Sequence, residues 1–165
     1  MKQILLLRGI NLGKRNKVPM QALKEFMTNQ GFLNVKTYSQ TGNVCVETNE
    51  KIDIDKLEHE LERCFGFSIP VMIRTLNELI AITEQPLFSK DYVMVIFFKD
   101  TSRYPEIKHL IDEQHVLFNN QIIIHYSKSY HKTKFTNNWF EKQLHTQGTL
   151  RNKQTILKMI ERFSR

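Results

Sequence analysis

The chain has 165 residues, of which 41% are hydrophobic and 25% charged. This length suffices for one domain or two small subdomains whose core needs neither a metal nor disulfides. No apolar run approaches the roughly 20 residues of a membrane helix, and the N-terminal run is too short for a secretory signal. We therefore expect a cytoplasmic protein with no membrane partner.

The net charge of +7 lies mostly in residues 85–165. Such an imbalance favours an anionic partner, either nucleic acid or a small phosphate-bearing ligand. Solubility alone would also explain it, so the charge indicates a class of partner without requiring one.

The first half of the chain alternates predicted strands and helices in a recognisable order. Apolar patterning and turn residues predict a strand at 4–7, a helix from Pro19 to Gly31, strands at 35–39 and 43–47, a helix at 55–65 and a strand at 69–73. The order β-α-β-β-α-β is the ferredoxin-like plan. With the connecting helix that Pro86 stops, residues 1–84 form the first predicted subdomain.

The second half repeats this order up to its second helix. The pattern predicts a central strand at 92–98, a helix from Pro105, strands at 116–118 and 122–126, and a helix capped by Thr136. No sixth strand signal follows before a C-terminal helix that Asn152 can cap. We therefore predict an α+β fold with two ferredoxin-like subdomains, the second, at 85–165, lacking its last strand and finished by a C-terminal helix.

One edge of the first predicted sheet collects polar residues. In a β-α-β-β-α-β unit, the loop after the first strand and the turn between the second and third strands lie at the same edge. A basic, glycine-bearing loop before a helix suits an anion, whereas turn chemistry alone also explains Asn and Gly there. The candidate ligand-binding residues at this edge are Arg8, Asn11, Lys14, Asn16, Lys17, Gln40, Thr41 and Asn43.

Two further segments have a binding and a purely structural interpretation. Residues 149–155 offer Arg151, Asn152 and Thr155 as ligand-binding candidates, because Arg151 stands beside the free amides of a helix start. A helix cap alone would explain the same segment. In residues 127–136 three lysines surround Tyr130, which suits single-stranded nucleic acid, although a flexible surface loop would look the same.

Catalytic and metal motifs do not emerge from the sequence. The segment Gly9–Lys14 is one residue too short for a P-loop, and Arg15 stands where such a loop needs Ser or Thr. The histidines lack metal-ligand spacing, and we predict Cys45 and Cys64 to be small core residues. We therefore assign no metal and no cofactor, and leave catalysis open because no nucleophile–base pair can be argued.

Three segments of the chain resemble family 1697 of the domains of unknown function, over roughly residues 3–160. They are LLLRGINLGKRNKVPMQALKEFM, GFLNVKTYSQTGNVCV and GTLRNKQTILKM. Thr41 stands in place of the family's serine, and Lys153 and Gln154 in place of its Trp-Asn. The resemblance implies two ferredoxin-like subdomains, the second incomplete, and no established activity. The matching residues are Arg8, Gly9, Ile10, Asn11, Gly13, Asn16, Lys17, Val18, Pro19, Met20, Gln40, Gly42, Asn43, Thr149, Arg151, Asn152 and Thr155.

Three hypotheses about function follow. The first is a module that binds a phosphate-bearing ligand, nucleic acid or nucleotide, at the basic loop edge. The second is an enzyme acting on a small anionic metabolite in a cleft between the subdomains. The third is a non-catalytic scaffold whose polar motifs only cap helices and shape turns. The sequence leaves the oligomeric state open.

Overall fold

A computed structural model describes residues 1–165 as two compact units. The first unit comprises Met1–Leu76 together with Met159–Arg165, and the second comprises Asn77–Lys158. The division thus falls after Leu76 rather than at residue 84, and the last residues of the chain join the first unit. No helix has the length and apolar character needed to cross a membrane.

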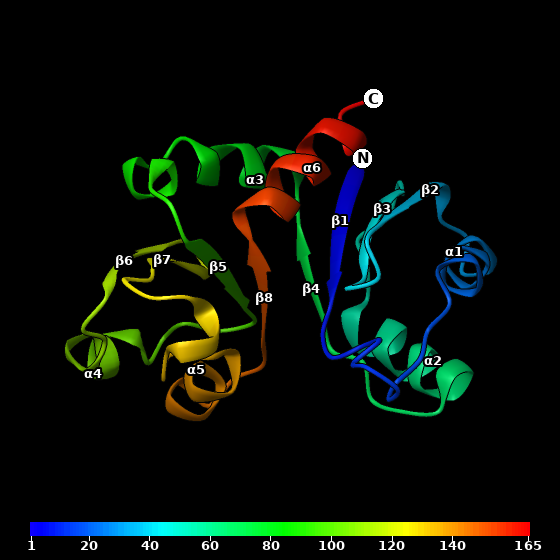
Figure 1. Cartoon of the computed structure of the whole chain (residues 1–165). Helices are drawn as coiled ribbons and strands as arrows, with labels where there is room; N and C mark the ends of the chain where they lie inside the picture. The colour runs from blue at the N-terminus through cyan, green and yellow to red at the C-terminus, as the bar shows by residue number, and fades with distance from the viewer. The chain divides into compact units, whose positions relative to one another are not determined.

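The first unit contains a four-stranded antiparallel sheet in the order β2-β3-β1-β4, with β1 between β3 and β4 (Figure 1). Its elements are β1 (Lys2–Leu7), α1 (Met20–Asn29), β2 (Leu33–Tyr38), β3 (Asn43–Glu47), α2 (Ile54–Phe65) and β4 (Val71–Arg74). The predicted strands and helices of this half of the chain are confirmed to within a few residues.

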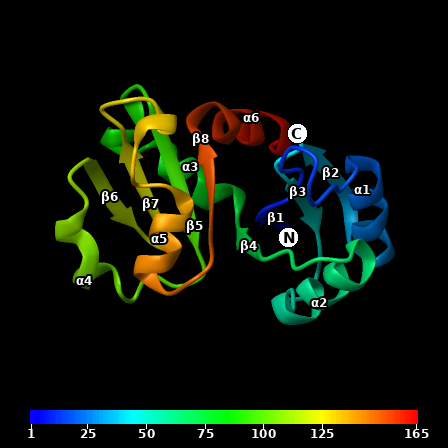
Figure 2. The same cartoon turned by 60° about the horizontal axis from the view of Figure 1, so that its bottom comes forward.

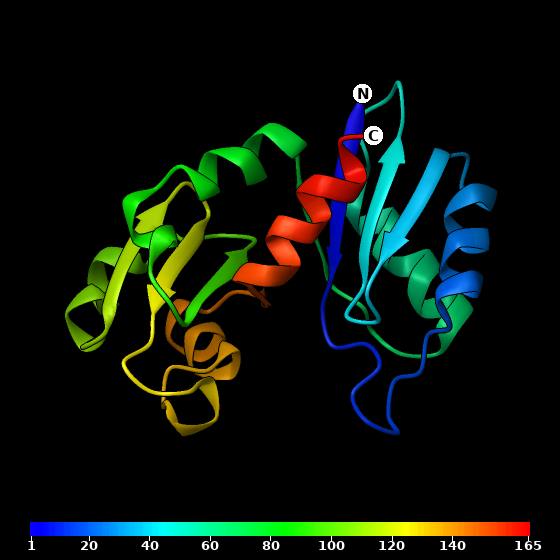
Figure 3. The same ribbon diagram turned by 45° about the horizontal axis from the view of Figure 1, so that its top comes forward.

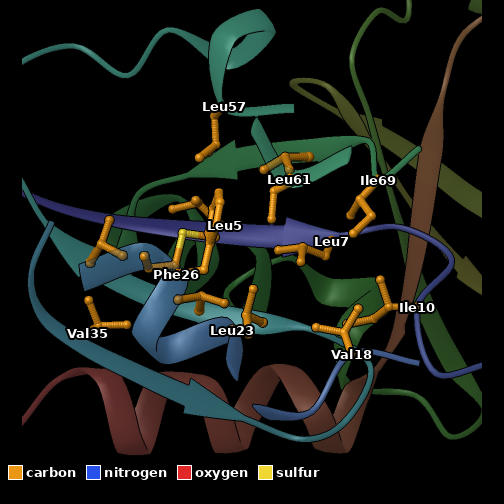
Figure 4. Close-up of a cluster of buried hydrophobic side chains, with 14 residues drawn as sticks. Leu5, Leu7, Ile10, Val18, Leu23, Phe26, Val35, Leu57, Leu61 and Ile69 are labelled. Carbon is orange, nitrogen blue, oxygen red and sulfur yellow. The ribbon is translucent and has the colours of Figure 1, made fainter. Parts of the chain in front are cut away.

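The core of the first unit lies between the sheet and its two helices. Leu5 and Leu7 of β1 lie on one face of the strand, because side chains alternate across a strand, and they join Leu23 of α1 and Leu61 of α2 in one buried cluster (Figure 4). Ile4 and Leu6, on the other face, are also buried. A strand buried on both faces explains the unbroken apolar run that opens the chain.

The second unit contains the other four-stranded antiparallel sheet, in the order β6-β7-β5-β8. Residues of α4 and α5 cover one face of this sheet and bury Ile96 and Phe98 of β5 (Figure 2). The remaining helices and strands of the chain are α3 (Leu76–Thr83), β5 (Val93–Phe98), α4 (Tyr104–Ile107), β6 (Gln114–Phe118), β7 (Gln121–His125), α5 (Asn137–Leu144), β8 (Gly148–Asn152) and α6 (Lys153–Phe163). With two such sheets and six helices, the predicted α+β class is confirmed.

The prediction that the second unit lacks its last strand is wrong. Residues Gly148–Asn152 form β8, which pairs antiparallel with β5. The strand carries no apolar alternation, because Thr149 and Arg151 are its buried side chains. Arg151 donates a hydrogen bond of 2.7 Å to Thr149 Oγ1, so the polar side chains supply partners for each other in the interior.

Hydrogen bonds at the end of the first strand recur in both units. The amide of Leu7 donates to the Gly42 carbonyl at 2.9 Å, and the amide of Phe98 donates to the Asn120 carbonyl at 2.9 Å. The next amide along, Arg8, donates to Pro70, just as Lys99 donates to Gln147. Each unit therefore holds the same two connections at the same edge of its sheet, which makes one unit an internal reference for the other.

Candidate functional site

The basic loop, residues 8–18, leaves the end of β1 and projects beyond the turn between β2 and β3 (Figure 3). Its backbone folds back on itself as a small hairpin. The amide of Asn11 donates to the Asn16 carbonyl at 2.8 Å, and Leu12 and Arg15 exchange two backbone hydrogen bonds of 3.0 and 2.9 Å. The loop is therefore a defined structure with a tip at Gly13 and Lys14.

The side chain of Asn11 fixes the base of this hairpin. Its Nδ2 donates to the carbonyls of Val18, at 3.0 Å, and Gln40, at 2.8 Å, while its Oδ1 accepts from the Val18 amide at 2.8 Å. Asn11 also adopts a left-handed backbone, with φ 53°, which Asn tolerates better than most residues. One side chain thus joins both arms of the loop to the β2–β3 turn, as the connectivity of the strands predicted.

Asn16 is a second structural tie. Its Nδ2 donates to the Gly9 carbonyl at 3.0 Å, and its backbone is left-handed with φ 55°. Asn16 therefore closes the hairpin from the opposite arm, and its amide group is used within the protein.

The β2–β3 turn packs against the loop at Gly42. A Cβ atom there would lie 2.8 Å from Ile10 Cδ1 and 2.9 Å from Leu7 Cβ, and φ is +91°. Both the contact and the backbone conformation require glycine. The turn and the loop therefore fit together closely at this edge.

The polar residues of the turn are used in different ways. Asn43 is fully buried, and its Nδ2 donates to the Tyr38 carbonyl at 2.8 Å and to Thr41 Oγ1 at 3.0 Å. Gln40 contributes its backbone carbonyl to Asn11, and its side chain is exposed, as is that of Thr41. The buried amide of Asn43 is thus a structural tie, whereas Gln40 and Thr41 face solvent.

Three cations lie at the tip of the loop and on the arm that leads to α1. Lys14, Arg15 and Lys17 are exposed, and no hydrogen bond or ion pair holds any of the three side chains. Residues 8–18 contain no acid. Arg8 differs, because it is half-buried at the root of the loop. The candidate surface at this edge is therefore a fixed backbone that carries three exposed cations, Lys14, Arg15 and Lys17.

The equivalent edge of the second unit lacks this feature. There the loop after β5 is short, and Asp100 bonds within it, accepting from the Ser102 amide at 2.9 Å and from Ser102 Oγ at 3.0 Å. The buried Gln121 occupies the position that Asn43 holds in the first unit. The basic loop is therefore an elaboration of one unit and not a requirement of the shared architecture.

The second group of predicted residues belongs to the second unit. Arg151 is 4% exposed, and burial lowers the pKa of its guanidinium to about 10. Its Nη1 donates to Thr149 and to the Leu150 carbonyl, so it is placed as a structural residue of β8. Asn152 Oδ1 accepts from the Thr155 amide at 2.8 Å, which confirms the predicted cap of α6.

The two cysteines and the acidic groups do not form a metal centre, since no group of three or more His, Cys, Asp or Glu side chains could hold an ion. Cys45 is buried, as predicted, and burial raises the pKa of its thiol. The prediction that Cys64 is a core residue is wrong, because it lies on the exposed face of α2.

The fold and the loop define an α+β protein of two sheets, one of which carries a fixed basic hairpin. Its residues 1–127 match the family described as "Protein of unknown function (DUF1697)". The chain belongs to this family, which confirms the resemblance seen in the sequence.

One solved structure shares the whole architecture. It is the conserved bacterial protein SP0830 from Streptococcus pneumoniae, which is 24% identical to this chain. The similarity covers 99% of this chain and 98% of that protein, with a TM-score of 0.77, and it shows the fold alone. No curated protein matches the chain.

Proposed function

We propose that the protein binds the phosphate backbone of nucleic acid through its basic loop. The observation that carries this proposal is the set of three exposed, unpaired cations, Lys14, Arg15 and Lys17, on a loop that contains no acid. The phosphates of nucleic acid bind such a cluster favourably, because each neutralised phosphate releases a condensed counterion.

The fixed shape of the loop supports binding rather than mere solubility. Asn11 and Asn16 make four hydrogen bonds to backbone groups, three within the loop and one to the Gln40 carbonyl, so the cations are mounted on a base that needs no ordering when a ligand arrives. A preformed site loses less conformational entropy on binding than a flexible one. Solubility alone would not require the cations to be held on a fixed backbone.

The exposed position of the cations favours an extended polyanion over a small metabolite. Residues Leu12–Lys17 are all exposed and the loop projects from the sheet (Figure 3). Small ligands bind in concave sites that surround most of their surface, whereas a protrusion can enter a groove or lie along a phosphate chain. Contacts to phosphates carry no sequence information, so we expect binding independent of sequence.

In this proposal the asparagine side chains at this edge stabilise the fold and do not contact the ligand. Asn11, Asn16 and Asn43 all bond the protein's own backbone, as the scaffold hypothesis expects. We therefore place ligand contact on Lys14, Arg15 and Lys17, flanked by Arg8, Gln40 and Thr41. The hypothesis of an enzyme acting on a small anionic metabolite stays a prediction.

We also infer that each unit is ferredoxin-like. The support is that both have the element order β-α-β-β-α-β, counting β8, and equivalent strand orders, β2-β3-β1-β4 and β6-β7-β5-β8. The familiar use of such a sheet, stacking bases on aromatic side chains of its open face, does not fit the first unit. Its second face carries the aliphatic residues Ile4, Leu6 and Met72, all buried.

The proposed function is tested by measuring oligonucleotide binding against salt. Fluorescence anisotropy of a labelled oligonucleotide is followed for the wild type and for a triple variant that carries Lys14→Ala, Arg15→Ala and Lys17→Ala. Loss of three phosphate contacts should reduce the slope of log affinity against log salt by about 2 to 3. Equal affinity and slope for the two proteins would overturn the proposal.

The matched control removes the same charge elsewhere in the first unit. Lys24, Lys51 and Lys56 are exposed, and their triple replacement by Ala gives an equal net charge. We expect this control to retain most of the affinity and nearly all of the slope, because these lysines lie outside the loop.

A further inference from the structure

A second feature with ligand-binding character lies in the second unit, in a pocket of about 320 Å³. Tyr92, Tyr126 and Tyr130 contribute to its wall together with Met94 and Lys153. This volume falls at the lower end of the range of about 300–1,000 Å³ found for ligand pockets. Tyr92 and Tyr130 offer exposed ring surface to a flat ligand, whereas the buried Tyr126 supports Tyr130 from behind.

Two of these rings form a rigid wall. Tyr126 is 1% exposed, and its hydroxyl donates to the Phe135 carbonyl at 2.7 Å. Tyr130 packs edge-on against it, with ring centroids 5.8 Å apart and an interplanar angle of 65°. Tyr130 is only half-buried, so part of its ring surface remains available to a ligand.

Tyr92 contributes the third ring from an unusual position. It is 69% exposed, yet its backbone is left-handed with φ 53°, a conformation that is an outlier for a bulky residue. The turn around it is anchored to β7, because the Tyr126 amide donates to the Tyr92 carbonyl at 3.1 Å and the His125 ring bonds the Asp91 carbonyl. A large aromatic ring held exposed at a conformational cost has no evident role in packing.

The charge beside the pocket is mainly positive, with one carboxylate, Glu113, bonded to Ser127 next to Tyr126. The segment that contains Tyr130 carries three exposed lysines, at 128, 132 and 134, and residues 126–134 contain no acid. Lys153 stands in the pocket wall, where its Nζ donates to the Lys90 carbonyl at 3.2 Å. Asp91 is the one acid of the wall. Aromatic rings bordered by lysines are the combination that binds single-stranded nucleic acid, since bases stack on the rings and the cations neutralise the phosphates.

We propose that the pocket of Tyr92, Tyr126 and Tyr130 binds an unpaired base of single-stranded nucleic acid, with the lysines at 128, 132 and 134 on the neighbouring phosphates. This inference shares its class of ligand with the proposed function, but it rests on different residues in the other unit and on stacking rather than charge alone. It requires a single strand, because a base within a duplex cannot enter a pocket.

The test compares a single-stranded oligonucleotide with an abasic strand of equal length, which has the phosphates and lacks the bases. The ratio of the two affinities isolates base stacking from phosphate binding. We expect the wild type to bind the intact strand about tenfold more tightly, as one or two stacked bases provide. A wild-type ratio near one overturns the inference and leaves the basic loop proposal standing.

Tyrosine variants test whether the difference in affinity between the intact and the abasic strand arises in the pocket. Tyr92→Gly suits the left-handed backbone, so it should fold, and we expect it to bring the ratio close to one. Tyr130→Leu should also lower the ratio, whereas Tyr130→Phe, which keeps the ring, should retain it. Tyr104→Leu is the matched control, because Tyr104 is a tyrosine of the same unit that packs on His115 outside the pocket. A ratio unchanged in both Tyr92→Gly and Tyr130→Leu overturns the inference.

The same measurements separate the two proposals. The loop triple variant should weaken binding of the intact and abasic strands equally and so preserve the ratio. If that variant binds both strands as the wild type does, while the tyrosine variants lose the ratio, the pocket stands and the loop proposal fails. Absence of binding to either strand at low salt overturns both.

Discussion

Asn11 and Gln40, 29 residues apart in the chain, are joined by a hydrogen bond of 2.8 Å from the Asn11 side-chain amide to the Gln40 carbonyl. The bond connects the loop after β1 to the turn between β2 and β3. It makes the shape of the basic loop depend on one short side chain, and that dependence can be measured.

Replacing Asn11 by Ala should lower the free energy of unfolding by about 1–3 kcal/mol, because three hydrogen bonds are lost at a partly buried site. Urea denaturation gives this value. Asn11→Ala also forces alanine into the left-handed backbone of this position. Asn11→Gly separates this strain from the loss of hydrogen bonds, since Gly accepts the left-handed backbone yet removes the same bonds. Recovery of full stability in Asn11→Gly would show that the side-chain bonds contribute nothing.

Replacing Arg151 by Ala should cost roughly 2–5 kcal/mol of stability, as for other large buried side chains, and should leave oligonucleotide affinity unchanged. The pKa of Arg151 is lowered to about 10, so the group is charged in both the folded and unfolded states at lower pH. The cost should therefore be constant between about pH 6 and 9. Above about pH 10 the unfolded state binds more protons, so this group's contribution to stability rises with pH. A stable Arg151→Ala variant that loses binding would return Arg151 to the ligand site.

Replacing Gly148 by Ala should destabilise the second unit by about 1–3 kcal/mol through overpacking. The added Cβ would lie 2.6 Å from Phe98 Cδ1 and 3.1 Å from the Phe97 carbonyl. Thermal unfolding of Gly148→Ala, Phe98→Leu and the double variant forms a cycle. The combined cost should be smaller than the sum of the single costs, because the smaller Leu makes room for the methyl group; additive costs would contradict this steric account.

Replacing Tyr92 by Gly should raise the free energy of unfolding by roughly 0.5–1 kcal/mol, because the left-handed strain of about 1–2 kcal/mol exceeds the entropy cost of Gly, about 0.5–1 kcal/mol. Little burial is lost, since Tyr92 is 69% exposed. Chemical denaturation measures the change. A clear loss of stability would mean that the Tyr92 ring is held for packing.

The two cysteines should differ in reactivity. Cys64 is exposed, whereas Cys45 is 2% exposed and burial raises the pKa of its thiol, which keeps the reactive thiolate scarce. One equivalent of a thiol reagent should react rapidly with the native protein, at Cys64, and the second only on unfolding. Rapid labelling of Cys45 in the native protein would indicate that the β1–β3 region opens easily.

Local patterns made much of this fold predictable. The apolar run of β1, the glycine turn before Asn43 and the cap at Thr136 each depend on neighbouring residues, and the structure has the corresponding elements. The position of the basic loop beside the β2–β3 turn also followed, because connectivity alone brings those segments to one edge. The family was recognisable from the segment that contains this loop together with two others, GFLNVKTYSQTGNVCV and GTLRNKQTILKM.

Neighbouring residues along the chain were enough to establish the family, the α+β class, the order of most elements and the presence of an acid-free basic loop. Long-range packing was needed to show that Gly148–Asn152 is a strand, that Asn11 and Asn43 bond the backbone, and that Tyr92 is exposed in a left-handed turn. The difference arises because a polar side chain can face solvent or the interior, and its direction depends on partners that the folded chain brings to it. Arg151 lies in the interior because Thr149 and its own strand supply those partners.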